Sequence, residues 1–184
     1  MMGLVFTELL ESAERRYGLQ VIDAALCGAE TSTGGSYTAV ARYDHRELLR
    51  IVVGLSKETG EELGTIVQHF ATDLLDALLQ RPEASAAAGA TGTFALLELL
   101  EPTIHATVRT LHPAAAPPRF DCTRDADGSL RVVYRSHRCL ADFAAAMIRA
   151  CITRFGERIA IERRMIEADE GEQHEFRLLM QGEG

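Results

Sequence analysis

Five consecutive residues, Tyr134-Arg135-Ser136-His137-Arg138, carry the side chains of this sequence that are best suited to chemistry. In an extended strand, alternate side chains share a face, so Tyr134, Ser136 and Arg138 are predicted to form one row with a spacing of roughly 6–7 Å. A phenol, a hydroxyl and a guanidinium all donate hydrogen bonds, and arginine binds a carboxylate through two parallel N–H groups. The row therefore suits a ligand with one or two carboxylates. The alternative is an ordinary solvated strand face.

A second candidate is His105, which lies in an apolar helical pattern with Ile104, Val108 and Leu111. Taken alone, a histidine in such a pattern is more often a core or boundary residue than a ligand. The segment that follows it is rich in proline and precedes the strand that carries the donor row. A helix with one histidine, a proline-rich turn and a hairpin bearing Tyr-x-Ser-x-Arg together form a specific combination.

The composition is that of one globular domain. The chain has 184 residues, of which 47% are hydrophobic and 25% charged, so it can bury a sizeable core. Its formal net charge of -8 argues against nucleic-acid binding, which needs clustered Lys and Arg. No apolar run reaches the roughly 18 residues of a membrane span, and the N-terminus lacks the features of a signal peptide. We therefore expect a cytoplasmic protein.

The hydrophobic periodicity predicts helices first and strands later. Asp44 is the expected N-cap of one helix, with Glu47 as its capping-box partner and Gly60 as its end. Pro102 is expected in the first turn of the helix that carries His105. The expected helices are 4–16, 19–26, 44–60, 61–79, 94–100, 102–112 and 140–155; the expected strands are 119–124, 130–137, 158–167 and 174–180; residues 28–38 and 82–93 are expected to be loops, with turns at 125–128 and 169–171. This order predicts an α+β fold with an antiparallel sheet.

These residues resemble those of the bacterial heme nitric oxide/oxygen-binding (H-NOX) domains, which are related to the heme domain of soluble guanylate cyclase. The histidine and the Tyr134/Ser136/Arg138 motif at its expected distance are the most diagnostic features. The resemblance runs nearly end to end and also includes the Met-x-Gly start with Phe6, Gly35-Ser36-Tyr37-Thr38, Tyr43-Asp44 and Pro118. It implies a single domain over 1–184. An N-terminal helical subdomain, approximately 1–60, would pack on a proximal subdomain, 61–184, that holds a four-stranded antiparallel sheet with helices, and heme b would lie between them.

The resemblance also implies roles for individual residues. His105 would be the axial ligand of the heme iron, and Tyr134, Ser136 and Arg138 would bind the heme propionates. Pro118 would press on the porphyrin, and Val5 would push on it from the distal side.

The distal pocket would decide which gas binds. Oxygen-binding members of the family place a tyrosine, whose hydroxyl donates to O2, at the position that aligns with Phe143. The other aligned distal residues are also apolar: Leu9, Leu74, Leu78 and Met147. Because bound O2 carries partial negative charge and needs a donor, this pocket implies binding of NO and CO with exclusion of O2. The alternative is that these residues only pack in the hydrophobic core; both roles are compatible, because packing around the heme makes the pocket apolar.

The implied role is that of a sensor and not of an enzyme. In the family, NO weakens the iron–histidine bond, so here His105 and its helix would be released and a surface read by a partner would change. The sequence ends at Gly184 with no kinase or cyclase domain, so we expect a separate partner, either a histidine kinase or a diguanylate cyclase/phosphodiesterase.

The sequence departs from the family at several positions. Ile22 replaces a frequent tryptophan, and Phe70-Ala71 replaces a frequent Phe-Gly pair. Some relatives hold a structural zinc, but here only Cys139 and His174 match plausible ligands. Because structural zinc normally needs four ligands, we expect no zinc.

Two other functions remain open. Cys139, next to the donor row, suggests a thiol-based or redox-responsive interaction module in which heme is secondary. A heme enzyme such as a peroxidase would need a distal acid or base, and the aligned distal positions hold no histidine or arginine.

Overall fold

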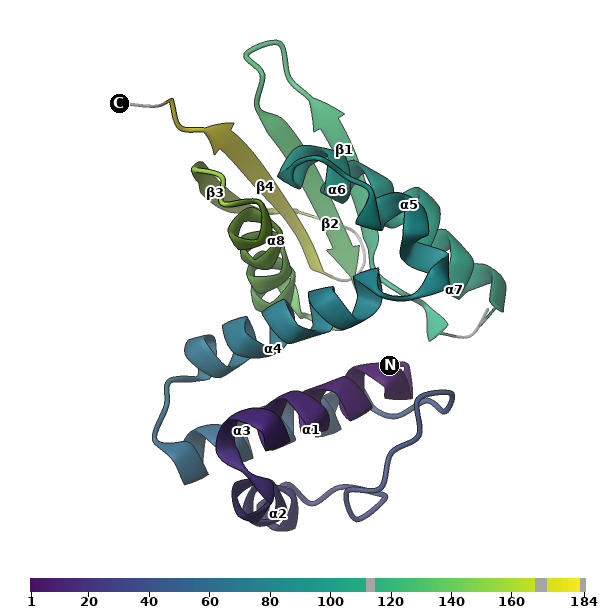
Figure 1. Cartoon of the computed structure of the whole chain (residues 1–184), viewed down its shortest axis with the longest axis vertical. Helices are drawn as coiled ribbons and strands as arrows, with labels where there is room; N and C mark the ends of the chain where they lie inside the picture. Colours follow the sequence, from purple (N-terminus) through teal and green to yellow (C-terminus); the bar gives the residue numbers. More distant parts are fainter. Residues whose placement is uncertain (112–114, 168–171, 183–184) are drawn as a thin grey trace. The chain divides into compact units, whose positions relative to one another are not determined.

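The computed structural model describes residues 1–111, 115–167 and 172–182. The chain divides into two compact units, residues 1–77 and residues 78–184. The expected turn at 169–171 and the expected end of the helix before Pro113 lie outside the described residues. The first unit is helical, whereas the second combines helices with a sheet (Figure 1). This arrangement confirms the predicted α+β class.

The first unit contains helices α1 (Gly3–Tyr17), α2 (Leu19–Gly28) and α3 (His45–Thr59) and most of α4 (Leu63–Leu79). The helix ends follow local signals. Asp44 accepts a hydrogen bond from the Arg46 N–H, at 3.0 Å, as the predicted N-cap of α3. Gly60 ends that helix in the left-handed conformation, with φ of 75°.

The start of α1 has no side-chain cap. Carbonyl oxygens from the loop between α2 and α3 accept its first N–H groups instead: Gly3 N–H donates to Ala41 O at 2.7 Å, and Leu4 N–H donates to Ala39 O at 2.9 Å. These bonds satisfy donors that a helix cannot satisfy within itself. They fix the first turn of α1, which carries Val5.

Glu47 is buried, with 4% exposure, and it does not complete the capping box that we expected. Its carboxylate accepts hydrogen bonds from the hydroxyls of Ser32, at 2.7 Å, and Tyr37, at 2.8 Å. The Tyr37 ring stacks on Phe6 of α1, with 4.5 Å between the ring centroids. A buried carboxylate needs such donors, so Glu47 connects the loop of residues 29–44 to both α3 and α1.

The second unit begins with the end of α4 and continues through η1 (Pro82–Ala84), α5 (Ser85–Ala88) and α6 (Thr93–Leu100). Our prediction that residues 82–93 form only a loop is wrong, because η1 and α5 lie within that range. Glu157 supplies the N-terminal cap of α6 by accepting the Thr93 N–H at 2.9 Å. A negative charge there also complements the helix dipole.

The sheet of the second unit has four antiparallel strands in the order β1-β2-β4-β3. Their bounds are β1 (Arg119–Arg124), β2 (Leu130–Ser136), β3 (Ile159–Ile166) and β4 (Glu172–Met180). The Asp125–Gly128 turn joins β1 and β2 as predicted, with Gly128 at φ of 83°. Helices α6 and α8 (Ala141–Phe155) cover one face of the sheet (Figure 1). The buried side chains of Leu130, Val132 and Tyr134 point to that face.

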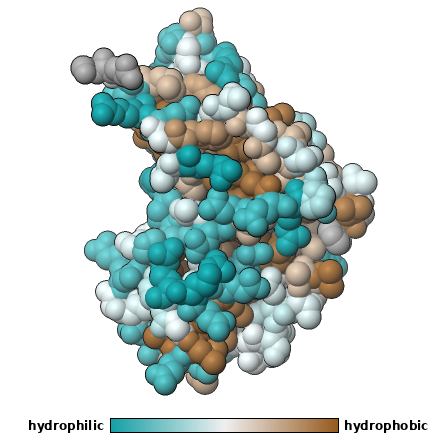
Figure 2. All heavy atoms as spheres, viewed as in Figure 1, coloured by the Kyte–Doolittle hydropathy of each residue, from teal (hydrophilic) through white to brown (hydrophobic). Residues whose placement is uncertain are grey.

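None of the helices within the described residues is long and apolar enough to cross a membrane. Large exposed apolar residues such as Val40, Leu111 and Met165 are spread along the chain. Brown residues are interspersed with teal and white ones on the face seen in Figure 2. Scattered apolar residues of this kind are normal on a protein surface.

The contact between α2 and α3 gives a stability prediction. A Cβ atom at Gly54 would lie 2.8 Å from Ala25 O, so Gly54→Ala should lower the free energy of unfolding by about 1–3 kcal/mol through overpacking. Gly64, in α4, has no atom within 4 Å of such a Cβ. Gly64→Ala should therefore raise the stability by about 0.5–1 kcal/mol. Urea unfolding measures both; equal effects of the two substitutions would contradict the close contact.

Candidate functional site

The segment that carries His105 is an uninterrupted helical stretch with a widened turn. A π-helix, η2 (Glu101–His105), joins α6 directly to α7 (Ala106–Leu111). Pro102 lies in the first turn of the element that carries His105, as expected, but this element is a π-helix that continues α6 without a break. Proline lacks an N–H and clashes with the preceding turn of an α-helix, and a wider turn relieves this conflict. The Ala106 N–H donates to Glu101 O across the turn.

The carboxylate of Glu101 fixes the imidazole of His105. Glu101 Oε2 lies 3.0 Å from His105 Nδ1, and the His105 side chain is 16% exposed. Glu101 also accepts the Phe120 N–H at 3.2 Å and pairs with Arg109 at 2.6 Å. Burial alone would raise the pKa of Glu101, but these hydrogen bonds lower it to about 2. Glu101 is therefore a fixed anion.

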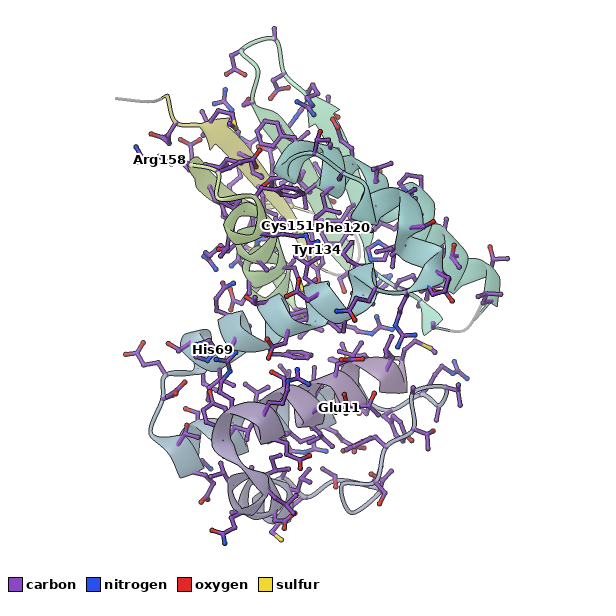
Figure 3. All side chains as sticks on the ribbon, viewed as in Figure 1. Glu11, His69, Phe120, Tyr134, Cys151 and Arg158 are labelled. Atoms are coloured by element: carbon purple, nitrogen blue, oxygen red, sulfur yellow. The ribbon has the colours of Figure 1, made fainter. Side chains whose placement is uncertain are left out.

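Aromatic rings connect His105 to the sheet. The His105 ring stacks on Phe120 with 5.4 Å between centroids, and Phe120 in turn packs against Tyr134 at 5.3 Å. Figure 3 labels Phe120 and Tyr134, which pair across β1 and β2. Tyr134 is only 2% exposed. The fold thus brings the rings of His105 and Tyr134 into contact with the same phenylalanine, Phe120.

The predicted donor row is only partly straight. Tyr134 and Ser136 share a face of β2, but the strand ends at Ser136, so the prediction that Arg138 continues the row is wrong. Among the residues that the structure describes, pairing with β1 ends at Arg135 and pairing with β4 ends at Ser136. Ser136 Oγ accepts the Arg138 N–H at 3.1 Å, which bends the chain.

Arg138 is a partly buried cation. Its guanidinium donates to Ala115 O at 2.5 Å, and burial lowers its pKa from the ordinary value. Within the described ranges no carboxylate pairs with it. A guanidinium stays charged in proteins, so partial burial without an anionic partner favours binding of an anionic group here.

The remaining predicted site residues are apolar. Pro118 lies directly before β1 and is half-buried. In the first unit, Leu9 and Leu74 are buried and Val5 is half-buried. In the second unit, Leu78, Phe143 and Met147 are half-buried, with Phe143 and Met147 one turn apart on α8. None of these side chains carries an N–H or O–H group.

Sequence reasoning missed Glu101 and Phe120. Glu101 could have been found from its i, i+4 spacing to His105, because side chains at that spacing are neighbours on a helix. Phe120 could have been found from the hairpin register, which places it opposite Tyr134.

The cysteines fall into two classes. Cys27 and Cys139 are exposed, whereas Cys151 is buried and Cys122 is partly so. Burial raises the pKa of Cys151 to about 12; burial and the nearby charges of Glu98 and Glu101 raise that of Cys122 to about 11. No group of three or more His, Cys, Asp or Glu residues suited to a metal ion occurs among the residues that the structure describes.

Comparisons with known proteins agree with this arrangement. A search of curated proteins found no match. The Fe(II) unliganded H-NOX protein from K. algicida is 24% identical, with a TM-score of 0.82, and the match covers 100% of this chain and 98% of that chain. A mutant of the H-NOX protein from T. tengcongensis is 19% identical, with a TM-score of 0.84 and coverage of 99% and 98%. An H-NOX protein from S. oneidensis in the Fe(II)NO ligation state is 18% identical, with a TM-score of 0.82 and coverage of 99% and 100%.

These similarities show that the fold is the H-NOX fold and confirm the predicted combination of helices with a four-stranded antiparallel sheet. The family model described as Haem-NO-binding matches residues 2–163, which is most of the sequence. The chain therefore belongs to the Haem-NO-binding (H-NOX) family of heme-binding gas-sensor domains.

Proposed function

We propose that this chain binds heme b through Nε2 of His105 and senses nitric oxide and carbon monoxide while excluding O2. The main support for this proposal is the hydrogen bond between His105 Nδ1 and Glu101 Oε2, at 3.0 Å. It occupies one ring nitrogen and leaves Nε2 for a metal, which is a common arrangement of metal-binding histidines. Ferrous heme would supply the position at which a diatomic gas binds.

The other residues fit the acidic edge of a heme. Arg138 is a partly desolvated cation that gains from a carboxylate, and Ser136 lies beside it at the end of β2. Tyr134 lies on the same face of that strand. We assign these three side chains to the two propionates.

The gas preference follows from what the distal side chains lack. The side chains assigned to the distal pocket offer only hydrocarbon or thioether groups: Val5, Leu9, Leu74, Leu78, Phe143 and Met147. A bound O2 carries partial negative charge and is held by a donor, whereas NO and CO depend much less on one. Phe143 stands where the resemblance places the tyrosine of oxygen-binding relatives, and one solved relative is described as an oxygen complex.

The response would begin with a movement of His105. Glu101 bonds both to this histidine and to the Phe120 N–H of β1, so such a movement would reach the sheet. Pro118, directly before β1, and Val5 would press on the two faces of the porphyrin. A separate cytoplasmic signalling protein, a histidine kinase or a diguanylate cyclase/phosphodiesterase, would read the change.

Absorption spectroscopy tests the gas preference. Protein loaded with heme b is reduced with dithionite, desalted without oxygen, and exposed separately to NO, CO and air. We expect the Soret band to shift with NO and CO and no stable oxygen complex to form. Phe143→Tyr should gain an oxygen complex, because the added hydroxyl can donate to bound O2. Phe143→Leu, which adds no donor, is the matched control and should behave like the wild type.

A stable oxygen complex of the wild-type protein would contradict the NO-selective proposal. Failure to take up heme would contradict the proposed function as a whole.

The exposed Cys139 thiol keeps a redox-responsive module as a second candidate function. At pH 8, the pKa values near 11 and 12 leave on the order of 0.1% or less of Cys122 and Cys151 as the reactive thiolate. A disulfide reagent should therefore modify two thiols quickly and two slowly in native protein, and the rate for the slow pair should rise with pH. Removing the exposed pair, Cys27→Ser with Cys139→Ser, should abolish the fast phase.

Peroxide treatment then separates the two functions. We expect the NO-dependent spectral shift after peroxide to be the same in Cys139→Ala as in the wild type. A peroxide-induced loss of the shift that Cys139→Ala prevents would favour the thiol switch.

A further inference from the structure

The carboxylate of Glu101 has three donors from three different elements. His105 Nδ1 belongs to η2, the Arg109 guanidinium to α7 and the Phe120 N–H to β1. Oε2 is shared by His105 and Phe120, while Oε1 faces Arg109. A carboxylate held from three sides has little freedom to rotate away from the imidazole.

The donor count also fixes the tautomer of His105. Both carboxylate oxygens already face donors, because Oε2 accepts the Phe120 N–H and Oε1 faces the Arg109 guanidinium, so this contact assigns the donor role to Nδ1. In the neutral imidazole, the other nitrogen then has the lone pair. Among the described residues nothing bonds to Nε2, so that nitrogen is left as the metal ligand.

A carboxylate partner also changes the strength of an axial ligand. Hydrogen bonding of Nδ1–H to a carboxylate raises the basicity of the imidazole and fixes the ring orientation. In heme proteins this outer interaction is one of the means by which a protein tunes the iron. Arg109 neutralises part of the negative charge of Glu101, so it limits how far the carboxylate raises the basicity of the imidazole.

Resting on the proposed function, we propose that Glu101 is a positioning residue that holds His105 in the Nδ1–H tautomer and strengthens its bond to the heme iron. Its role goes beyond that of a structural ion pair, because it sets the electronic character of the axial ligand. Phe120 and Arg109 are the groups that keep the carboxylate in place.

The test compares Glu101→Gln with Glu98→Gln in heme-loaded protein. Glutamine keeps the size of Glu101 and a carbonyl acceptor but loses the charge. Glu98 precedes it by about one helical turn, undergoes the same change in charge and pairs with Arg124 at 2.7 Å without any contact to His105. It is therefore the matched control.

We expect Glu101→Gln to shift the iron–histidine stretching band in resonance Raman spectra to lower frequency. It should also raise the midpoint potential of the iron and speed heme transfer to a heme-binding acceptor protein by roughly 10-fold or more. Glu98→Gln should leave all three values at those of the wild type. A Glu101→Gln variant that matches Glu98→Gln would overturn the proposal while leaving the heme function intact.

If Glu101→Gln does not fold, NMR of the wild-type protein tests the same proposal. In the diamagnetic ferrous carbon monoxide complex, the His105 Nδ1 proton should be visible by NMR and exchange slowly with solvent. A freely exchanging proton would overturn the proposal. Absence of any iron–histidine band in the wild type would instead contradict the proposed function itself.

Discussion

The hydrogen bonds of the Glu101 carboxylate determine how the candidate site residues of the second unit are arranged. It lies in the wide turn that Pro102 favours, and it joins the turn to α7 and to the first strand. Withdrawing an anion from water is costly, and only several donors in good geometry offset that cost. The donors that satisfy Glu101 are therefore also the groups that determine where His105 and β1 lie.

The first unit also contains a buried carboxylate whose hydrogen-bond donors come from another segment. Glu47 is buried and is satisfied by two hydroxyls of the loop before α3, one of which belongs to a ring stacked on Phe6. Because burial raises the pKa of Glu47 and the hydroxyl donors more than offset this, the net shift is downward. The ionised carboxylate thus fixes the start of α1, which carries Val5 and Leu9. In each unit, therefore, a carboxylate with several donors determines the position of a neighbouring segment.

Local signals in the sequence predicted most of the elements but few of the interactions between them. Asp44, Gly60 and Gly156 mark helix ends because N-caps and left-handed C-caps are local. The α5 helix was missed because an alanine-rich segment with glycine was interpreted only as a loop. The π-helix was missed because Pro102 also suits the start of an α-helix.

The errors at the site have a long-range origin. The end of β2 at Ser136 depends on where its neighbours β1 and β4 stop, which the sequence of β2 does not contain. Glu47 fits a capping box locally, yet its burial directs the carboxylate to Ser32 and Tyr37.

The most direct measurement is resonance Raman spectroscopy of the ferrous heme protein made with two iron isotopes. We expect an isotope-sensitive iron–imidazole band in the wild type, its loss in His105→Gly, and its return when free imidazole is added to that variant. A band that persists unchanged in His105→Gly without imidazole would contradict the assignment of His105 as the axial ligand.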